Sequence, residues 1–316
     1  MNSVFSGWKN WRFWVLLIAT LLLIAALFNP RLPFPQRFFR YVFVFDITQS
    51  MNVDDVFIQD KKVTRLALSK RAIRKTIERM PCGSEAGLAV FTEHRSYLLF
   101  APVEVCAQFK ELGYMLDGID WTMAWRSRSE VAKGLIASLR IGEALEPAAR
   151  IVFLSDGHEA PPIHPDLRQV PKPVDPEFRG AVIGVGGNKP QPIPRFDLAG
   201  KKLGYWRAED IAQVDAYSSG RFGTGETMSG VDISDLEERL KNGSEHLSSL
   251  REPWLQQLAD EAGLDYERLN NASQTARFLT GQSFAQSKTV EGDARWIVAA
   301  VSFVLILLVY VIRPYR

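Results

Sequence analysis

Residues 41–50 read YVFVFDITQS, a run of aromatic and β-branched side chains that ends abruptly in polar ones. No polar residue interrupts the run before Asp46. A strand with one face in water would alternate between apolar and polar residues, so this pattern predicts a central parallel strand that is covered on both faces. Helices are then expected on both sides of the sheet.

Strands and helices alternate after this run. Residues 64–80 place apolar side chains at helical spacing behind Thr64, a suitable N-cap, and so predict an amphipathic helix against the first strand. The other expected elements are strands within 87–91, 96–103, 149–157 and 179–187, helices at 105–117 and 129–145, and a last helix with a short edge strand in 253–269. This order predicts one doubly wound, Rossmann-like and mostly parallel α/β sheet over residues 41–270, with its ligand site at the carboxyl ends of the strands.

Four segments fit no part of that alternation. Residues 31–40 are rich in Pro and Arg and predict a connector, and the Pro-rich residues 160–178 predict an extended loop. Residues 190–250 predict an insertion that contains a hairpin near 196–206. The polar stretch 271–293 predicts a linker.

Both ends of the chain are strongly apolar. The run 11–28 holds one charge and is about long enough to cross a bilayer at about 1.5 Å per residue, and the run 296–312 holds none. We therefore expect an N-terminal transmembrane anchor within 1–30 and a C-terminal transmembrane helix within 294–316. A cleaved signal peptide is the alternative for the first run and a buried core helix for the second. Basic residues lie on both sides of each run, so they do not decide the orientation.

The charge distribution excludes a nucleic-acid partner. The 38 basic and 36 acidic residues give a net charge of +2 at pH 7 and are spread along the chain. No basic stripe is available to hold a phosphate backbone.

The two cysteines are placed to meet. Cys82 precedes the apolar run 86–92 and Cys106 follows the run 97–103, so an antiparallel hairpin would bring both thiols to the same end. A disulfide there indicates an oxidising compartment such as the periplasm. The alternative is a pair of ordinary buried thiols.

Oxygen-bearing side chains follow two of the expected strands. Asp46, Thr48 and Ser50 come directly after the first strand and offer three hard oxygen donors, the ligand type that Mg²⁺ and Mn²⁺ prefer. Asp156 ends another buried strand, and Gly157 permits a sharp departure of the chain. Because the carboxyl ends of parallel strands meet at one edge, both aspartates are expected in one crevice.

These residues resemble the metal-ion-dependent adhesion site of the von Willebrand factor A domain. Asp46, Thr48 and Ser50 match its first motif, Asp-x-Ser-x-Ser, with Thr48 in place of the usual Ser, and Asp156 matches the Asp-Gly of its third motif. The resemblance covers about residues 38–270.

The second motif of that family, a Thr before a helix, is altered in this chain. Residues 129–135 align best and assign its role to Ser129, with Ser127 and Thr122 as alternatives. The surrounding stretch WTMAWRSRSE is rich in Trp and Arg, so this ligand is the one least defined by the sequence.

The resemblance implies a binding protein and not an enzyme. A site of this kind holds Mg²⁺, or Mn²⁺ or Ca²⁺ in its place, with few carboxylates, and an acidic side chain of a protein partner completes the coordination shell. The loops at 92–96, 118–129 and 157–178 would supply specificity. Trp121, Trp125 and Arg126 are candidate anchors of that surface, although the two Trp side chains have the alternative role of covering the sheet edge.

The segment DITQSMNVDDV, followed by TRLALSK and framed by the two apolar ends, also resembles the bacterial Bat-type proteins of aerotolerance operons. Such proteins accompany a MoxR-type AAA+ ATPase. The chain is similar as well to accessory von Willebrand A proteins of methanol-oxidation operons, which assist maturation and metal loading of a periplasmic dehydrogenase. Either resemblance implies a protein of the bacterial inner membrane with a periplasmic globular domain, which assembles with an AAA+ ATPase or related membrane proteins.

Two other functions compete with this interpretation. A von Willebrand fold with a vestigial metal site would act only as a scaffold of a membrane complex. A metal-dependent hydrolase or phosphatase is disfavoured, because haloacid-type phosphatases need a second Asp where Thr48 stands and no Gly-x-Ser-x-Gly elbow is present. His158, Glu159 and His164 are the candidates for a zinc site in the Pro-rich loop.

Overall fold

The computed structural model describes residues 11–124, 128–160, 169–197, 199–208 and 246–311. The chain divides into two compact units. One unit consists of residues 1–37 with 287–316, and the other of residues 38–286. The larger unit contains the sheet that residues 41–50 predict.

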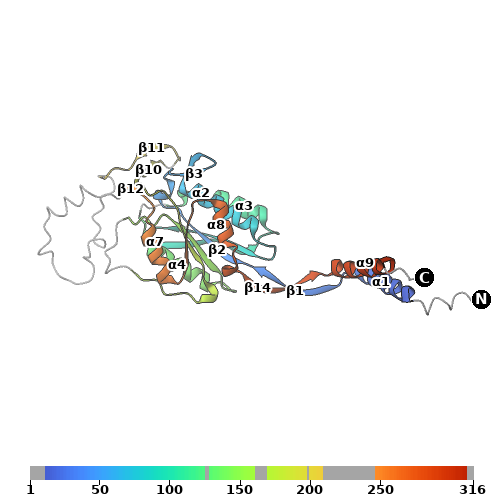
Figure 1. Ribbon diagram of the computed structural model, residues 1–316. Coiled ribbons are helices and arrows are strands. Elements are labelled where there is room, and N and C mark those ends of the chain that lie inside the picture. The colour runs from blue at the N-terminus through green and yellow to red at the C-terminus, as the bar shows by residue number, and fades with distance from the viewer. Residues whose placement is uncertain (1–10, 125–127, 161–168, 198, 209–245, 312–316) are drawn as a thin grey trace, which may run out of the picture. The chain divides into compact units, whose positions relative to one another are not determined.

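A six-stranded sheet forms the centre of the larger unit (Figure 1). All neighbouring strands are parallel except β5 and β6, which form an antiparallel hairpin. In spatial order the strands are β13 (Asp265–Arg268), β8 (Ala181–Gly184), β7 (Arg150–Ser155), β2 (Arg40–Asp46), β5 (Glu85–Thr92) and β6 (Arg95–Glu104). The mostly parallel α/β sheet is therefore present, and β2, which contains the apolar run that predicted it, lies inside the sheet.

Helices cover both faces of this sheet, as the unbroken apolar run of β2 predicts (Figure 1). Side chains of β2 alternate between two separate cores, with Phe43 and Phe45 in one and Val42 and Val44 in the other. The first core is covered by α2 (Arg65–Arg79), α3 (Phe109–Gly118) and α8 (Ala272–Leu279), and the second by α4 (Val131–Ala144) and α7 (Glu252–Ala262). Burial on both faces explains why β2 carries no polar alternation.

Helix α2 begins where the sequence predicts, and its buried face is partly polar. The Thr64 hydroxyl caps the helix by accepting a hydrogen bond at 3.2 Å from the backbone N–H three residues later. Arg65, Ser69 and Thr76 lie on the buried face. The hydroxyls of Ser69 and Thr76 donate to carbonyls four residues earlier in the same helix. The guanidinium of Arg65 is left to bond outside the helix.

The two ends of the insertion at 190–250 pair with each other. Strand β9 (Gln191–Pro192) pairs antiparallel with β12 (Leu247–Ser248). The predicted hairpin is formed by β10 (Pro194–Phe196) and β11 (Lys202–Tyr205), close to β12 in Figure 1. Residues 209–245 lie outside the described part of the chain.

Two short features add to the predicted elements. A hairpin of β3 (Val56–Ile58) and β4 (Lys61–Val63) follows the 3-10 turn η2 (Gln49–Asn52) and was not predicted, because three-residue strands are too short for a periodicity signal. The Pro-rich stretch 160–178 contains the turn η5 (Pro176–Phe178), as expected of a loop, and residues 161–168 lie outside the described part of the chain.

The polar stretch 271–293 is not a linker, which corrects the prediction. It contains α8, the turn η6 (Gln282–Phe284) and β14 (Gln286–Asp293). Asn271 caps α8 through its side chain, α8 packs against α2, and Ala272 and Leu279 are buried in the first core. The helix was overlooked because its eight residues carry only small or isolated apolar side chains on the buried face.

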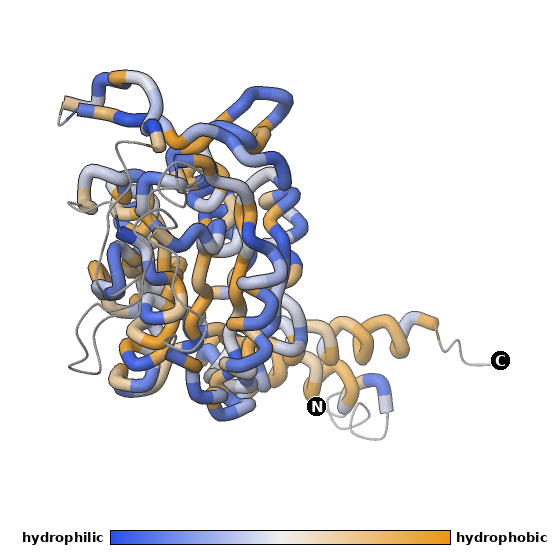
Figure 2. The backbone as a smooth tube through the Cα atoms, turned by 90° about the vertical axis from the view of Figure 1, so that its left-hand side faces the viewer, coloured by the Kyte–Doolittle hydropathy of each residue, from blue (hydrophilic) through white to orange (hydrophobic). Residues whose placement is uncertain are grey.

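The smaller unit consists of two apolar helices and a two-stranded sheet. Helices α1 (Trp11–Leu27) and α9 (Arg295–Val311) pack together, and Ser302 Oγ donates to the Ala19 carbonyl at 2.9 Å. Figure 2 colours both helices almost wholly as hydrophobic. Residues 31–40 are not an irregular connector, because β1 (Arg31–Phe38) fills most of them and pairs with β14.

The two transmembrane helices predicted from the sequence are not supported. Among the residues that the structure describes, no helix is both long enough and apolar enough to cross a membrane. Helices α1 and α9 have 17 residues each.

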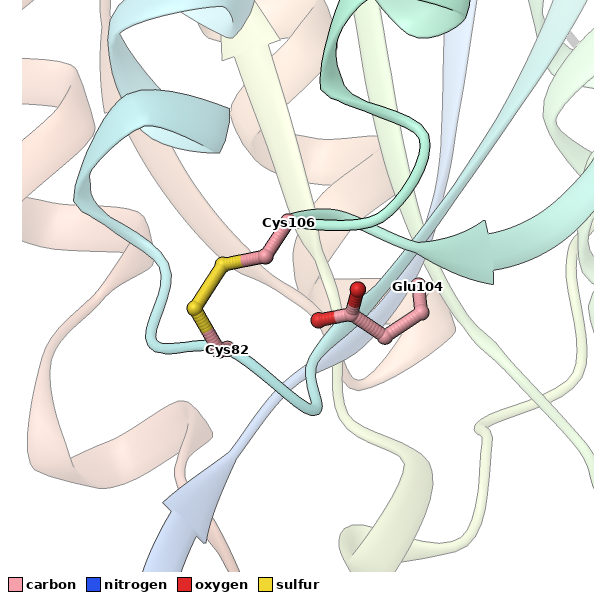
Figure 3. A group of neighbouring side chains, drawn as sticks. All are labelled: Cys82, Glu104 and Cys106. Atoms are coloured by element: carbon pink, nitrogen blue, oxygen red, sulfur yellow. A yellow bond between two sulfur atoms is a disulfide. The ribbon is translucent and has the colours of Figure 1, made fainter.

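Cys82 and Cys106 form a disulfide, as the hairpin geometry predicts (Figure 3). The bond joins the segment after α2 to the segment after β6, at the amino end of β5. The Glu104 carboxylate beside it accepts hydrogen bonds from the backbone of Gly83 at 2.6 Å and of Ala107 at 2.5 Å. These bonds hold the pKa of Glu104 below its usual value, although burial opposes them.

Candidate metal centre

Strand β2 delivers Asp46 to the carboxyl edge of the sheet with its side chain fully buried. Asp46 Oδ1 accepts from the Thr48 backbone N at 2.9 Å and from Thr48 Oγ1 at 2.6 Å. Asp46 Oδ2 accepts from Ser155 Oγ at 2.6 Å. The carboxylate is therefore held by one bond across to β7 and by two bonds within its own turn.

The hydroxyl of Ser50 joins this group. Ser50 lies in the turn η2, is 3% exposed, and its Oγ is 3.2 Å from Thr48 Oγ1. The three residues of the first motif, Asp46, Thr48 and Ser50, thus bring their side-chain oxygens together, as their spacing predicts. All three come from one strand tip and the turn that follows it.

Asp156 lies at the tip of β7 and is also fully buried. Its Oδ1 accepts from the backbone N of His158 at 2.9 Å, and the Ser50 hydroxyl also hydrogen-bonds to this carboxylate. Its Oδ2 accepts from Ser248 Oγ at 3.0 Å and from Arg65 Nη1 at 2.5 Å. The tips of β2 and β7 therefore converge, and Ser50 connects the two aspartates.

Ser129 lies at the same edge of the sheet. Its backbone N donates to the Ala160 carbonyl at 2.8 Å, and the next backbone N, of Glu130, donates to Glu93 at 2.6 Å. Glu93 follows β5 and Ala160 follows β7, the two strands that flank β2. Ser129 is therefore held between the loops on either side of the Asp46 strand.

The hydroxyl of Ser129 is buried and unsatisfied. The residue is 1% exposed, and among the described residues its Oγ has no hydrogen-bond partner. Of the alternatives for the second motif, Thr122 is exposed in the turn η3 (Trp121–Met123), and Ser127 lies outside the described residues. A buried oxygen without a partner costs free energy unless it binds something. Together with the other oxygen donors, it fits a hard divalent cation.

The two aspartates differ in acidity. Burial, followed by the charge of Asp156, raises the pKa of Asp46 to about 7, although hydrogen bonds from Ser155 and Thr48 oppose the rise. Burial alone would also raise the pKa of Asp156, but the charge of Arg65 outweighs it and keeps that pKa below the usual value. Near neutral pH, Asp46 therefore holds a proton that a divalent cation can displace.

Arg65 is a residue at this edge that sequence reasoning missed. Its side chain is fully buried, and it pairs with Asp55 through Nε to Oδ1 at 2.9 Å and Nη2 to Oδ2 at 2.6 Å. Gly186, at φ +138°, lies against it, because an added Cβ would approach Arg65 Nε to 2.8 Å. The spacing of Arg65 with Ser69 and Thr76 was the available signal that it lies on the buried face of α2.

Ser155 and Ser248 are the other missed residues. Ser155 is fully buried and holds Asp46 in place while accepting a bond from the Gly157 backbone at 2.9 Å. Ser248 comes from β12, at the C-terminal end of the insertion, and no local pattern connects it with Asp156.

Two surface predictions have different outcomes. The Trp121 ring stacks on Phe196 of β10 with centroids 5.2 Å apart, so it packs against the β10–β11 hairpin, a contact that neither predicted role describes. Trp125, Arg126 and the zinc candidate His164 lie outside the described residues.

The Glu159 carboxyl, a zinc candidate, is half-buried and accepts a hydrogen bond at 3.4 Å from the Ala132 backbone N in the first turn of α4. Burial is the main cause that raises its pKa to about 7. Within the described chain, His158 and Glu159 belong to no cluster of three metal-binding side chains.

No protein-family model matches this chain, and no curated protein matches it at a significant level. Solved structures of similar shape include an aerotolerance-related membrane protein from Bacteroides fragilis, at 17% identity and a TM-score of 0.48 over 78% of this chain and 98% of that one. The conserved hypothetical protein BatB from Bacteroides thetaiotaomicron is similar at 16% identity and a TM-score of 0.47, over 77% of this chain and 95% of that one.

The ArnB paralog VWA2 from Sulfolobus acidocaldarius is similar at 19% identity and a TM-score of 0.32, over 49% of this chain and 37% of that one. The chain is thus similar to Bat-type and von Willebrand A proteins, at identities and TM-scores that do not assign it to a family.

Proposed function

We propose that this chain binds a divalent cation, Mg²⁺ or Mn²⁺ or Ca²⁺, and uses it to hold an acidic side chain of a protein partner. The proposed ligands are Asp46, Thr48, Ser50, Ser129 and Asp156. The observation that carries the proposal is the buried hydroxyl of Ser129, which finds no hydrogen-bond partner in the described part of the chain and lies at the edge where the other four residues gather.

The donor set favours binding over turnover. Two carboxylates and three hydroxyls leave a divalent ion electrophilic, with water in its remaining positions, and a carboxylate from a partner can replace one water. The candidate oxygens are at most 3% exposed, so a ligand must reach below the surface, as an extended Asp or Glu side chain can. The loops after β5, before α4 and after β7 surround that approach.

We further propose that the chain acts at the bacterial inner membrane, with the larger unit in the periplasm. Exposed apolar side chains on α1 and α9 support membrane association, and the Cys82–Cys106 disulfide supports an oxidising compartment. The resemblance of the first motif to Bat-type and methanol-oxidation accessory proteins supports a role in assembly or metal loading of a partner, together with a MoxR-type AAA+ ATPase or related membrane proteins.

Thermal unfolding with and without Mg²⁺ or Mn²⁺ tests the cation site. A cation that binds only the folded chain must raise its midpoint temperature. We expect a rise for the wild type, no rise for Asp46→Ala, and an unchanged rise for Asp54→Ala, because Asp54 is an exposed carboxylate in the same segment. Pull-down of partners with and without a chelator then tests whether the cation holds a protein.

One observation favours the scaffold alternative. Arg65 already places a positive charge at 2.5 Å from Asp156, so part of the negative charge of the site is compensated without a metal. If the wild type shows no stabilisation by any divalent cation, the chain is a scaffold with a vestigial site.

A further inference from the structure

A fixed positive charge lies beside a site that is proposed to bind a cation. Arg65 is fully buried, and its Nη1 contacts Asp156 Oδ2 at 2.5 Å and Ser248 Oγ at 2.6 Å. A cation bound at Asp156 would therefore share that carboxylate with a guanidinium. Charge repulsion between the two cations weakens the binding of the metal ion.

The guanidinium is compensated from its other side. Its Nε and Nη2 bond both oxygens of Asp55, and Asp55 Oδ2 also accepts from the Gly187 backbone N at 2.9 Å. Burial by itself would lower the pKa of Arg65, but the hydrogen bond to Asp55 and the charges of Asp156 and Asp55 raise it. Arg65 is therefore charged at every relevant pH, and Asp55 determines how much of that charge Asp156 must balance.

The charges around the ion balance only in sum. Asp46, Asp55 and Asp156 together balance a divalent cation and Arg65, but Asp55 lies on the far side of the guanidinium, so Asp156 is shared between Arg65 Nη1 and the ion. An anionic ligand on the metal ion offsets the repulsion between the ion and Arg65. Because coupling between two binding events is reciprocal, a carboxylate that binds better in the presence of the ion also tightens the binding of the ion.

We propose that Arg65 is a positioning residue that makes cation binding depend on an anionic ligand. Acting through Asp156, it keeps the affinity for the free cation low and raises the affinity once a carboxylate joins the ion. The inference rests on the proposed cation site and explains how the site would favour an acidic partner over water.

The experiment measures Mn²⁺ affinity of the full chain by calorimetry, in sodium acetate and in sodium chloride of equal ionic strength. Acetate is the probe for a carboxylate ligand. For the wild type we expect acetate to tighten Mn²⁺ binding by at least about fivefold, the lower range of measured couplings. The exposed neighbour Asp54 provides the matched control, and Asp54→Asn should keep the wild-type ratio.

Two variants should change the ratio of the Mn²⁺ affinity in acetate to that in chloride in opposite directions. Arg65→Gln removes the charge, so it should bind Mn²⁺ more tightly in chloride and lose most of the acetate effect. Asp55→Asn removes the far-side compensation but keeps the size of the side chain, so it should bind Mn²⁺ more weakly in chloride and show a larger acetate effect. A purely structural role of Arg65 would not produce this reversal. If Arg65→Gln does not fold, Asp55→Asn alone decides.

The outcomes separate this inference from the proposed function. Equal acetate effects in the wild type, Arg65→Gln and Asp55→Asn would refute the role of Arg65 and leave the cation site standing. No Mn²⁺ binding by the wild type in either salt would refute the cation site itself.

Discussion

The two ends of the sheet both bury charged side chains, but they satisfy them with different partners. At the amino end, Arg150 donates to the backbone carbonyls of Glu177 and Phe284, and Arg40 donates to that of Pro147 at 3.0 Å and also pairs with the Glu85 carboxylate. At the carboxyl end, Arg65 is bound by the carboxylates of Asp55 and Asp156. The carboxylate that pairs with Arg40 is 25% exposed, whereas those that pair with Arg65 are at most 9% exposed.

This difference assigns a role to each end. The amino end is held mainly by backbone carbonyls, by the partly exposed Arg40–Glu85 ion pair and by the Cys82–Cys106 bond, which suits a structural role. The carboxyl end concentrates ionisable groups, raises the pKa of Asp46 to about 7, and leaves the Ser129 hydroxyl unsatisfied. One sheet can therefore separate stability from binding, because its ends are about one strand length apart and carry different chemistry.

The comparison is tested most strongly by Asp156→Ala. Removing this carboxylate leaves the buried Arg65 with only Asp55 as a charged partner, so we expect a loss of about 3–5 kcal/mol in the free energy of unfolding. A carboxylate at the rim of a sheet would otherwise be expected to matter little for the fold, and burial of its pair with Arg65 changes that expectation for Asp156. Urea denaturation measures the effect, with Asp156→Asn as the smaller change. A loss below about 1 kcal/mol would show that Asp156 does not balance Arg65.

Removing the disulfide should affect stability alone. The bond closes a loop with a sequence separation of 24 residues. The Cys82→Ser, Cys106→Ser double variant should lose about 3 kcal/mol of unfolding free energy, mainly by freeing the unfolded chain. Its midpoint shift with Mg²⁺ should equal that of the wild type. A reduced shift would mean that the two ends of the sheet are coupled.

The pH dependence of stability should also distinguish the carboxyl end of the sheet from its amino end. The folded pKa of Asp46, about 7, lies above its ordinary value of 3.8, so between these values the folded chain holds a proton that the unfolded chain has lost. The contribution of Asp46 to stability is therefore present in acid and is lost as the pH rises through about 7.

A cation must displace this proton, so Mn²⁺ affinity should rise about tenfold per pH unit between about pH 5 and 7 and then level off. Calorimetry at several pH values measures this slope. Burial also raises the pKa of Glu159 to about 7, but Glu159 is not a proposed ligand. Glu159→Gln should therefore keep the slope, and a wild-type affinity that does not change with pH would contradict a protonated Asp46.

The smallest effect on stability is expected for Ser129→Ala. The Ser129 hydroxyl has no hydrogen bond among the described residues, so its loss should change the unfolding free energy by less than about 0.5 kcal/mol while weakening Mn²⁺ binding. Ser138→Ala is the matched control, because the Ser138 hydroxyl is also buried but has a partner: it donates to the Gly134 carbonyl at 2.8 Å. It should cost about 1 kcal/mol and leave Mn²⁺ affinity unchanged. Equal behaviour of the two variants would remove the support that Ser129 gives to the cation site.

Much of the fold follows from short-range patterns. The apolar run of β2 predicts its burial on both faces, Thr64 predicts the start of α2, and the two cysteines predict their bond once the β5–β6 hairpin is assumed. Helix α8 was missed because eight residues with few large apolar side chains produce a weak periodic signal. The apolar runs 11–28 and 296–312 predicted the positions of α1 and α9 to within about one residue at each described end.

The candidate site likewise has residues that local sequence patterns predict and residues that only packing brings together. Asp46, Thr48 and Ser50 were predictable because their spacing within one turn forces their oxygens together. The contacts of Arg65 with Asp156 and Ser248 span 91 and 183 residues of sequence, and no local pattern connects them. Side chains so far apart in the chain become neighbours only when β2, β7 and the two ends of the insertion pack together.

By itself, the sequence determined the parallel sheet, its buried central strand and the oxygen-rich turn at that strand's tip, because periodicity and spacing act over a few residues. Only the tertiary structure decided that a buried arginine from α2 faces this turn and that the Ser129 hydroxyl has no partner among the residues described there. The physical reason is that charge compensation and hydrogen-bond satisfaction depend on which distant groups are within about 3 Å of each other, and that distance is set by packing.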